Sequence, residues 1–288
     1  MDGIARHGLT RRTTVAGGFA TSLAGVASAA DCAAPDDFRY GGKLQQAGFL
    51  VGRTAPRAEV LVNGEKVGEA SAGGVFLVGF DRDEPDMATV AVRHGGAEAR
   101  RAVAIAKGVF DIQRINGLKE DQVSPSDPAL LARIAVETER KAKAFASRDD
   151  ADSFKDGFDW PVMAKRISAR FGGQRILNGE PKRPHYGVDL AAPVGTTIRA
   201  PAAGLVVLAE PAMHFEGGLT LIDHGQGLVG MFLHQSRQMV TAGDRVSRGQ
   251  TIGEVGQTGR ATGPHLCWRL KWRARNLDPS LLVGATGL

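Results

Sequence analysis

The sequence predicts a mostly β protein made of a small N-terminal β-sandwich, a helical connector and a C-terminal antiparallel β-domain. The 288 residues include 38 glycines without a three-residue period, which indicates many tight turns between short strands. Short apolar runs separated by turn residues occupy both halves of the chain, and a single segment between them has helical periodicity. These features exclude an all-α protein and, at 43% hydrophobic content, a disordered chain.

Composition also limits the function classes. Two cysteines, Cys32 and Cys267, allow at most one disulfide and exclude a four-cysteine zinc module. The formal charge is +5, and it falls to +3 without residues 1–29, which hold three arginines and one aspartate. This weak excess favours an anionic partner, and without interleaved aromatic and basic residues it does not predict a nucleic-acid partner.

Residues 1–30 are predicted to be an export signal. Arg11 and Arg12 precede the mildly apolar run Val15–Val26, and Ala27-Ser28-Ala29 supplies the small-x-small pattern of a cleavage site. The paired arginines resemble a twin-arginine signal. The apolar run is shorter than the about 20 residues that span a bilayer. We therefore expect a periplasmic or secreted protein with no integral membrane span in the mature chain.

Residues 37–115 are predicted to form the β-sandwich, which has the size of an immunoglobulin domain. Asn63-Gly64 is a strong signal for a two-residue hairpin, because both positions of that turn need positive φ. The expected strands are Gly48–Val51, Glu59–Val62, Lys66–Gly68, Val75–Phe80, Thr89–Arg93 and Arg101–Ile105.

Residues 126–150 are predicted to be the helical connector. Asp127 is a capping residue and Pro128 suits the first turn, so a helix is expected over Pro128–Ser147. Its expected apolar positions are Leu131, Ile134, Thr138, Ala142 and Phe145. Its expected solvated face carries Glu137, Glu139, Arg140, Lys141 and Lys143.

Residues 156–288 are predicted to form the second β-domain, which carries the chemistry. His185 and Asp189 are good ligands for zinc, but in a straight strand their spacing is about 13 Å, at ~3.3 Å per residue. Convergence on one metal therefore needs a bend at Gly187. Taken alone, the pair also fits a histidine and a capping aspartate beside a turn.

Two further pieces strengthen the case for a site. Strand alternation sends His265 and Cys267 to the same face, with Leu266 pointing into the core. His234 closes the apolar run Phe232-Leu233, where it also fits a core histidine. It is the joint arrangement that favours a functional site.

An ordered series of motifs lies between Trp160 and Leu282. They are Trp160-Pro161-Val162, Phe171-Gly172, His185-x-Gly-x-Asp189, Ala191-Ala192-Pro193-x-Gly195, Ala203-Gly204-x-Val206, Asp223-His224-Gly225, Phe232-Leu233-His234, Gly243-Asp244-x-Val246, Gly249-Gln250-x-Ile252-Gly253 and Thr258-Gly259-x-x-Thr262-Gly263-Pro264-His265. This region resembles the LytM and lysostaphin-like M23 zinc metallopeptidases, which implies a LytM-type domain of the duplicated-hybrid-motif kind.

The resemblance implies that His185 and Asp189 bind Zn²⁺, and that His234 and His265 act beside the reacting water as general base and transition-state stabiliser. It also implies hydrolysis of peptide crosslinks in bacterial peptidoglycan by a zinc metalloendopeptidase. His224 matches a turn between strands, where a structural role is expected. Arg170, Lys182 and Arg183 are expected at the rim of the cleft, near an anionic wall.

The third metal ligand departs from the family pattern. The family has a His-x-His motif, and this chain has Cys267 in place of the second histidine. A cysteine thiolate also ligates zinc, so we expect a working site of lower formal charge. The alternative is a catalytically impaired activator of cell-wall amidases, with an amidase or divisome partner. The segment Thr241–Gly253 also resembles a biotinyl carrier hairpin, but it has no lysine to modify.

Overall fold

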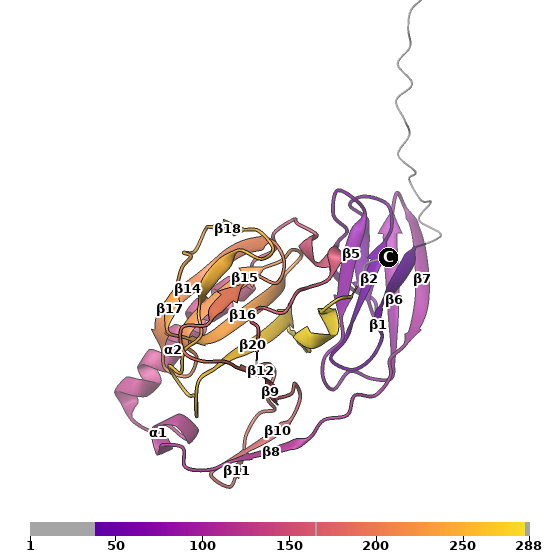
Figure 1. Cartoon of the computed structure of the whole chain (residues 1–288). Coiled ribbons are helices and arrows are strands. Elements are labelled where there is room, and N and C mark those ends of the chain that lie inside the picture. Colours follow the sequence, from indigo (N-terminus) through magenta and orange to yellow (C-terminus); the bar gives the residue numbers. More distant parts are fainter. Residues whose placement is uncertain (1–37, 165, 286–288) are drawn as a thin grey trace, which may run out of the picture. The chain divides into compact units, whose positions relative to one another are not determined.

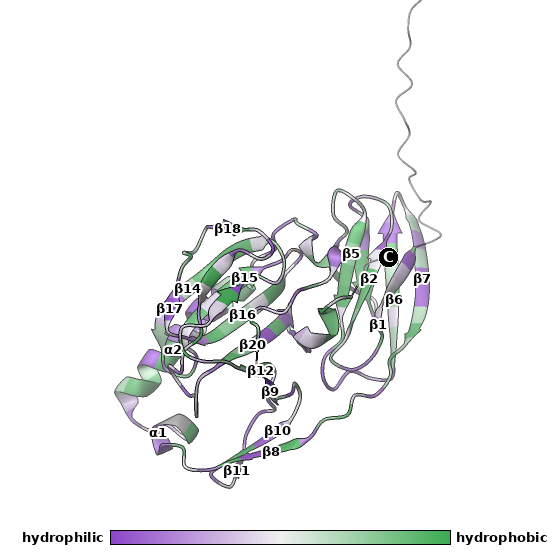
Figure 2. Ribbon diagram, in the orientation of Figure 1, coloured by the Kyte–Doolittle hydropathy of each residue, from purple (hydrophilic) through white to green (hydrophobic). Residues whose placement is uncertain are grey.

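The first seven strands form two antiparallel sheets (Figure 1), with strand orders β1-β2-β5 and β4-β3-β6-β7. Apolar side chains of both sheets join one buried cluster, and Figure 2 shows hydrophobic colour along β2 and β5. The bounds are β1 Arg39–Lys43, β2 Phe49–Arg53, β3 Glu59–Val62, β4 Glu65–Glu69, β5 Val75–Gly79, β6 Met87–His94 and β7 Ala97–Ala104. All six strands expected in this region are present, and β1 adds a seventh.

The structure is a computed structural model that describes residues 38–164 and 166–285, without the side chain of Gln122. The export signal expected at residues 1–30 and Cys32 lie outside these residues. The described residues belong to one compact unit. None of their helices combines the length and the apolar character needed to cross a membrane.

The turn at Asn63-Gly64 joins β3 to β4 as the sequence predicts. Asn63 has a φ of 51° and Gly64 a φ of 87°, and Val62 pairs with Glu65 across the turn. Two positive φ values at the central positions define a type I′ turn, whose twist matches that of the strands it joins. The local sequence therefore sets the register of this hairpin.

The connector contains the expected helix. After β8 (Ile112–Ile115), the chain forms α1 (Glu120–Val123) and then α2 (Pro128–Phe145). Asp127 caps α2, because its side chain accepts a hydrogen bond from the backbone N–H of Leu130 at 2.8 Å.

The expected solvated face of α2 is wrong at two positions. Glu137 is buried, and its carboxylate accepts hydrogen bonds from Arg133 Nε and from the backbone N–H of His214. Lys141 is largely buried as well, and it forms an ion pair with Glu216. Leu131, Thr138 and Ala142, expected on the packed face, are exposed. Helical periodicity failed here because α2 docks partly through the Lys141–Glu216 ion pair and the hydrogen bond from His214 to Glu137, and a hydropathy pattern treats such charged residues as solvated.

The rest of the chain builds a large antiparallel sheet and two small sheets. The large sheet has the order β18-β14-β15-β16-β20-β12-β9, with β21 beside β20; the small sheets are β13-β19-β17 and β11-β10-β8. In the last of these, β8 runs parallel to β10. The remaining bounds are η1 Ser153–Asp156, β9 Arg166–Ala169, β10 Gln174–Leu177, β11 Glu180–Pro181, β12 Val188–Ala191, β13 Thr197–Arg199, β14 Gly204–Met213, β15 Gly217–Asp223, β16 Leu228–Gln235, β17 Arg237–Gln238, β18 Arg245–Val246, β19 Thr251–Glu254, β20 His265–Trp272, β21 Arg275–Leu277 and η2 Pro279–Leu282.

Both faces of the large sheet are covered, so its central strands are buried throughout and mostly apolar. Every residue of β15 and β16 is buried, and Figure 2 shows hydrophobic colour along both. On one face, Leu221, Met231 and Cys267 share a cluster with Ala144 of α2. On the other, Leu266 joins the main core cluster. The mostly β, antiparallel fold class is therefore confirmed.

The C-terminal strands also contact the first sheets. The backbone N–H of Asp278 donates to the Ala47 carbonyl at 2.8 Å, and Arg275 pairs with Glu84 at 3.3 Å. A Cβ added at Gly79 would lie 2.9 Å from the Leu277 side chain, so the two surfaces touch closely. The domain limits drawn from the sequence remain a prediction.

His224 has the structural environment expected of it, and that environment predicts a pH-dependent stability. Burial lowers its pKa to about 4. Its Nδ1–H donates to the Ala203 carbonyl at 2.8 Å, and its ring packs against Phe158. Between pH 6.5 and pH 4 the unfolded chain takes up a proton that the folded chain excludes, so stability falls as the pH falls. We expect this histidine to cost about 2 kcal/mol of unfolding free energy between pH 6.5 and pH 5.

Urea unfolding of the wild type and of His224→Asn at pH 7 and pH 5 measures this effect. The variant should be less stable at pH 7 but should lose less stability on acidification than the wild type. An equal loss in both proteins would contradict this prediction.

Candidate active site

Three neighbouring strands bring the predicted site residues together. In the register of the large sheet, Asp189 of β12 pairs with Cys267 of β20, and Cys267 pairs with Leu233 of β16. His185 lies three residues before β12, where two backbone hydrogen bonds with Gly172 and Gly173 hold it in place. Side chains from distant parts of the chain therefore meet at one end of these strands.

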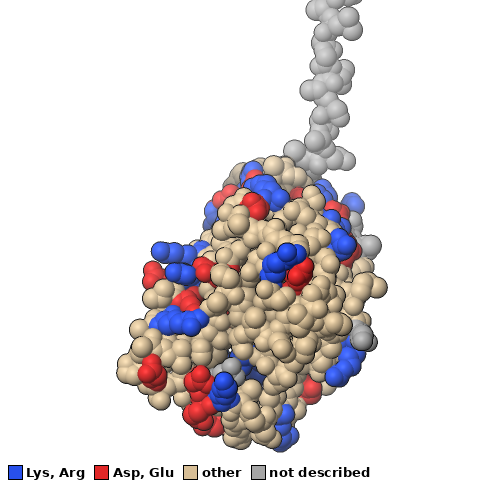
Figure 3. All heavy atoms as spheres, turned by 60° about the vertical axis from the view of Figure 1, so that its left-hand side comes forward, with Lys and Arg blue, Asp and Glu red and all other residues tan. Residues whose placement is uncertain are grey.

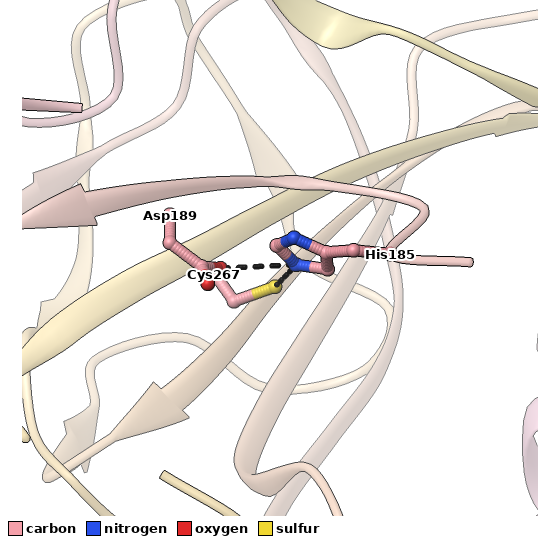
Figure 4. Close-up of side chains that lie close together, drawn as sticks. All are labelled: His185, Asp189 and Cys267. Atoms are coloured by element: carbon pink, nitrogen blue, oxygen red, sulfur yellow. Dashed lines mark hydrogen bonds and ion pairs between the residues drawn. The ribbon is translucent and has the colours of Figure 1, made fainter. Parts of the chain in front are cut away.

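Three potential metal ligands converge in a buried position. Figure 4 shows the side chains of Asp189 and Cys267 pointing toward the His185 ring. His185 Nε2 lies 3.1 Å from Asp189 Oδ1 and 3.4 Å from Cys267 Sγ. One ligand atom from each residue falls within 4.8 Å of the other two.

This donor set fits zinc. One zinc ion bridges such separations, since Zn–N and Zn–O distances are about 2.0–2.2 Å and a Zn–S distance is about 2.3 Å. Asp189 Oδ1 is buried and meets no hydrogen-bond donor in suitable geometry within the described part of the chain. A buried carboxylate oxygen without a donor is costly, and a bound cation would satisfy it.

Gly187 permits the convergence through close packing. Its φ is not among the positive values, so the bend does not require a glycine conformation. A Cβ added there would instead lie 2.6 Å from Arg269 Cγ, 3.0 Å from the Trp268 carbonyl oxygen and 3.2 Å from Cys267 Sγ. The missing side chain therefore lets the backbone between His185 and Asp189 pass close to β20.

We expect Gly187→Ala to push Cys267 and Arg269 away from His185. The overpacking should lower the unfolding free energy by about 1–3 kcal/mol and weaken metal binding. Gly195→Ala is an instructive control, because a Cβ added at Gly195 meets nothing within 4 Å although its φ of 84° is strained. Urea unfolding and metal titration of both variants test this. Unchanged metal affinity in Gly187→Ala would contradict the packing argument.

His234 reaches the site through a strained backbone. Its φ is 64°, a value that is uncommon outside glycine. Strict alternation would send it to the face opposite Leu233 and Cys267, and the left-handed conformation changes that direction. Its Nδ1 lies 2.8 Å from the Thr258 carbonyl oxygen, so Nδ1 carries the proton and Nε2 has a free lone pair. No sequence pattern would have predicted this conformation.

His265 is the second imidazole at the site. Its ring centroid lies 4.8 Å from that of His234, and its Nε2 lies 3.7 Å from Asp189 Oδ1. Its Nδ1–H donates to the Gly263 carbonyl at 2.8 Å, so its Nε2 is also unprotonated. All five residues predicted for the site thus lie together.

Burial keeps the two imidazoles neutral and charges keep the carboxyl ionised. Burial lowers the pKa of His234 to about 4, and it also lowers the pKa of His265. Burial alone would raise the pKa of the Asp189 carboxyl, but its contacts with the rings of His185 and His265 and the positive charge of Arg175 outweigh burial and hold that pKa well below its usual range. At neutral pH the site thus offers proton acceptors beside a carboxylate.

The sequence reasoning missed two arginines that touch the ligands. Arg269 Nε donates to Cys267 Sγ at 3.4 Å, and Arg175 Nη2 lies 3.6 Å from Asp189 Oδ2. Arg269 could have been found, because it follows Cys267 by two residues in one strand and shares its face. Arg175 could not have been, since β10 lies in another sheet.

Two cavities are lined by residues of the candidate site. Arg170 lines a cavity of about 740 Å³ together with Asp189 and His265. Lys182 and Arg183 line a second cavity of about 590 Å³ that reaches His185. The three expected rim residues thus lie beside the site.

The chain resembles known peptidases in sequence and in structure. Residues 183–279 match the profile of peptidase family M23. Over 133 residues the chain is 41% identical to the peptidoglycan DD-endopeptidase ShyA of Vibrio cholerae, covering 45% of this chain and 30% of ShyA. Over 126 residues it is 35% identical to the DD-carboxypeptidase/endopeptidase Mpg of Neisseria meningitidis, covering 43% of this chain and 29% of Mpg. The matches thus span less than a third of the length of these curated relatives.

One solved structure is similar over nearly its whole length. The crystal structure of a putative peptidase M23 from Pseudomonas aeruginosa has a TM-score of 0.65 and 30% identity, and the match covers 84% of this chain and 96% of that one. An antiparallel β fold with a candidate metal site of His185, Asp189 and Cys267 defines a peptidase-like protein. The chain belongs to peptidase family M23.

Proposed function

We propose that the protein is a zinc metalloendopeptidase that hydrolyses peptide crosslinks in bacterial peptidoglycan, in the periplasm or outside the cell. The observation that carries this is the convergence of His185, Asp189 and Cys267 beside two neutral histidines. The names of ShyA and Mpg support the substrate class.

In this proposal His185, Asp189 and Cys267 hold the zinc. When bound, the ion supplies a Lewis acid toward the scissile carbonyl and toward water. His234 Nε2 is placed to accept the proton of the attacking water, because its Nδ1–H is fixed on Thr258. His265 is placed to stabilise charge that develops on the carbonyl oxygen, with its ring oriented by Gly263.

The thiolate changes the charge of the site. Two histidines and one aspartate would leave a zinc site at +1, whereas Cys267 and Asp189 together bring it to zero and weaken the Lewis acid. Arg269 opposes this effect, because its donor to Cys267 Sγ withdraws charge from the sulfur. We therefore propose a working site.

Cys267 also supports a second candidate function, an impaired LytM-type activator of cell-wall amidases. A thiolate ligand lowers the charge that hydrolysis uses. In that case the fold would serve as a binding surface for an amidase or divisome protein. The two candidates differ in whether the protein cuts peptidoglycan by itself.

Incubating the purified protein with sacculi, with and without a chelator, separates the candidates. We expect soluble peptide-cleaved fragments, identified by mass spectrometry, that disappear with chelator and return when zinc is restored. Fragments that form only after an amidase is added would contradict the peptidase proposal and favour the activator.

A further inference from the structure

A cavity lined by cations adjoins the candidate metal centre. It has a volume of about 590 Å³ and reaches His185 at one end. Its cationic side chains, here called the basic cavity, are Arg175, Lys182, Arg183, Arg260, Arg269 and Lys271. Among the described residues that line it, none is acidic.

At least one face of the protein surface does not share this character. On the face drawn in Figure 3, cationic and anionic side chains are interspersed. The basic cavity therefore concentrates positive charge, whereas that face carries charges of both signs.

Several of these cations are buried at a cost. Arg175 Nε is buried and has no hydrogen-bond partner within the described residues. The positive charge of Arg175 lies near that of Arg260 and of Arg269, and burial followed by these two neighbours lowers the pKa of Arg260 to about 10. Like charges that lie close together in a buried space are unfavourable, and an anion held between them would offset that cost.

The basic cavity adjoins the candidate active site. A small cavity of about 150 Å³ contains Asp189, His234 and His265, and it shares Arg175, Leu177, Arg260 and Arg269 with the basic cavity. A peptide whose scissile bond lies at His234 and His265 would thus place a neighbouring group among the arginines.

We propose that the basic cavity binds a carboxylate of the peptide substrate and so determines specificity. This inference rests on the proposed peptidase function, because the carboxylate belongs to the same substrate peptide as the scissile bond. Guanidinium groups are suited to bind a carboxylate, since their planar donors match its two oxygens in a bidentate arrangement. Arg183 and Lys271 are the members suited to a test, because neither forms a described contact with His185, Asp189 or Cys267.

The test compares acetyl-D-alanine with its amide, using the full zinc-loaded chain and calorimetric titration. We expect the carboxylate to bind at least about 10-fold more tightly than the amide, the effect of a charge-assisted hydrogen bond. Arg183→Gln/Lys271→Gln should reduce carboxylate affinity about 10-fold and leave amide affinity unchanged. The control is Arg100→Gln/Arg237→Gln, which removes the same number of charges from ion pairs with Glu98 and Glu254. It should change neither the carboxylate affinity nor the amide affinity.

The comparison of variants excludes direct binding to the metal, which the outer cations would not affect. Equal carboxylate affinity in the wild type and in Arg183→Gln/Lys271→Gln would overturn the proposal. Inorganic phosphate that binds more tightly than acetyl-D-alanine, with the same dependence on these two cations, would overturn the assignment to a peptide carboxylate. If the wild type and Arg183→Gln/Lys271→Gln bind acetyl-D-alanine equally and the wild type still cuts sacculi, the carboxylate site alone is overturned. If the wild type leaves sacculi intact but its binding of acetyl-D-alanine depends on Arg183 and Lys271, the peptidase proposal is overturned and the carboxylate site stands.

Discussion

Asp189→Asn is expected to abolish stoichiometric zinc binding and to lower the rate of crosslink hydrolysis more than about 100-fold. Residues that only orient a metal ligand already cost 10- to 100-fold, so the loss of a ligand itself should exceed that range. Asparagine keeps the volume of the side chain but removes the negative charge that pairs with His185 and Arg175. The effect thus reports charge and ligation rather than packing.

Metal analysis of the purified variant, together with fragment release from sacculi, measures this effect. Asp159→Asn is a matched control, because that carboxylate is exposed and pairs with Arg248 away from the ligands. Circular dichroism shows whether each variant keeps its fold. A folded Asp189→Asn protein that retains full zinc and full activity would contradict the metal centre described above.

Replacing Cys267 should have the second-largest effect. In Cys267→Ser the hydroxyl replaces the sulfur with little change in volume, but it is a far poorer zinc ligand at neutral pH. We expect zinc affinity to fall by more than about 100-fold, because the loss of a ligand should exceed the 10- to 100-fold effect of residues that only orient a ligand. Because Cys267 is buried beside Gly187, the substitution should leave the surface unchanged.

Cys267→His separates ligation from charge. It restores the His-x-His pattern and the +1 charge, so zinc should stay bound and hydrolysis should be faster if the thiolate weakens the Lewis acid. The larger ring must displace Arg269, which contacts the sulfur at 3.4 Å. Stoichiometric zinc in Cys267→Ser would refute Cys267 as a ligand. Zinc lost from both Cys267→Ser and Cys267→His would instead indicate a packing role.

Much of the fold could be predicted from local pattern. Alternation and the Asn63-Gly64 turn predicted the strands of the first sheets, and Asp127 with Pro128 predicted the start of α2. The burial of Glu137 and Lys141 could not be predicted, because the backbone N–H of His214 and the carboxylate of Glu216, which contact them, lie far along the chain. Local patterns describe a segment, while such burial depends on the surface on which the segment packs.

The five site residues were identified from spacing together with the family resemblance, and the structure brings them together. What the sequence could not show is how they meet. His185 and Asp189 converge because Gly187 allows close packing rather than an unusual φ, and His234 enters through a left-handed backbone. The arginines around the ligands come from two sheets, so only the tertiary structure reveals the basic cavity.

The central claim is that a histidine, an aspartate and a thiolate hold one zinc ion in this protein. X-ray absorption at the zinc edge, on protein loaded with one equivalent of zinc, tests it most directly. We expect one sulfur at about 2.3 Å and nitrogen or oxygen ligands at about 2.0–2.2 Å. A fully loaded protein whose zinc has only nitrogen and oxygen neighbours would contradict it.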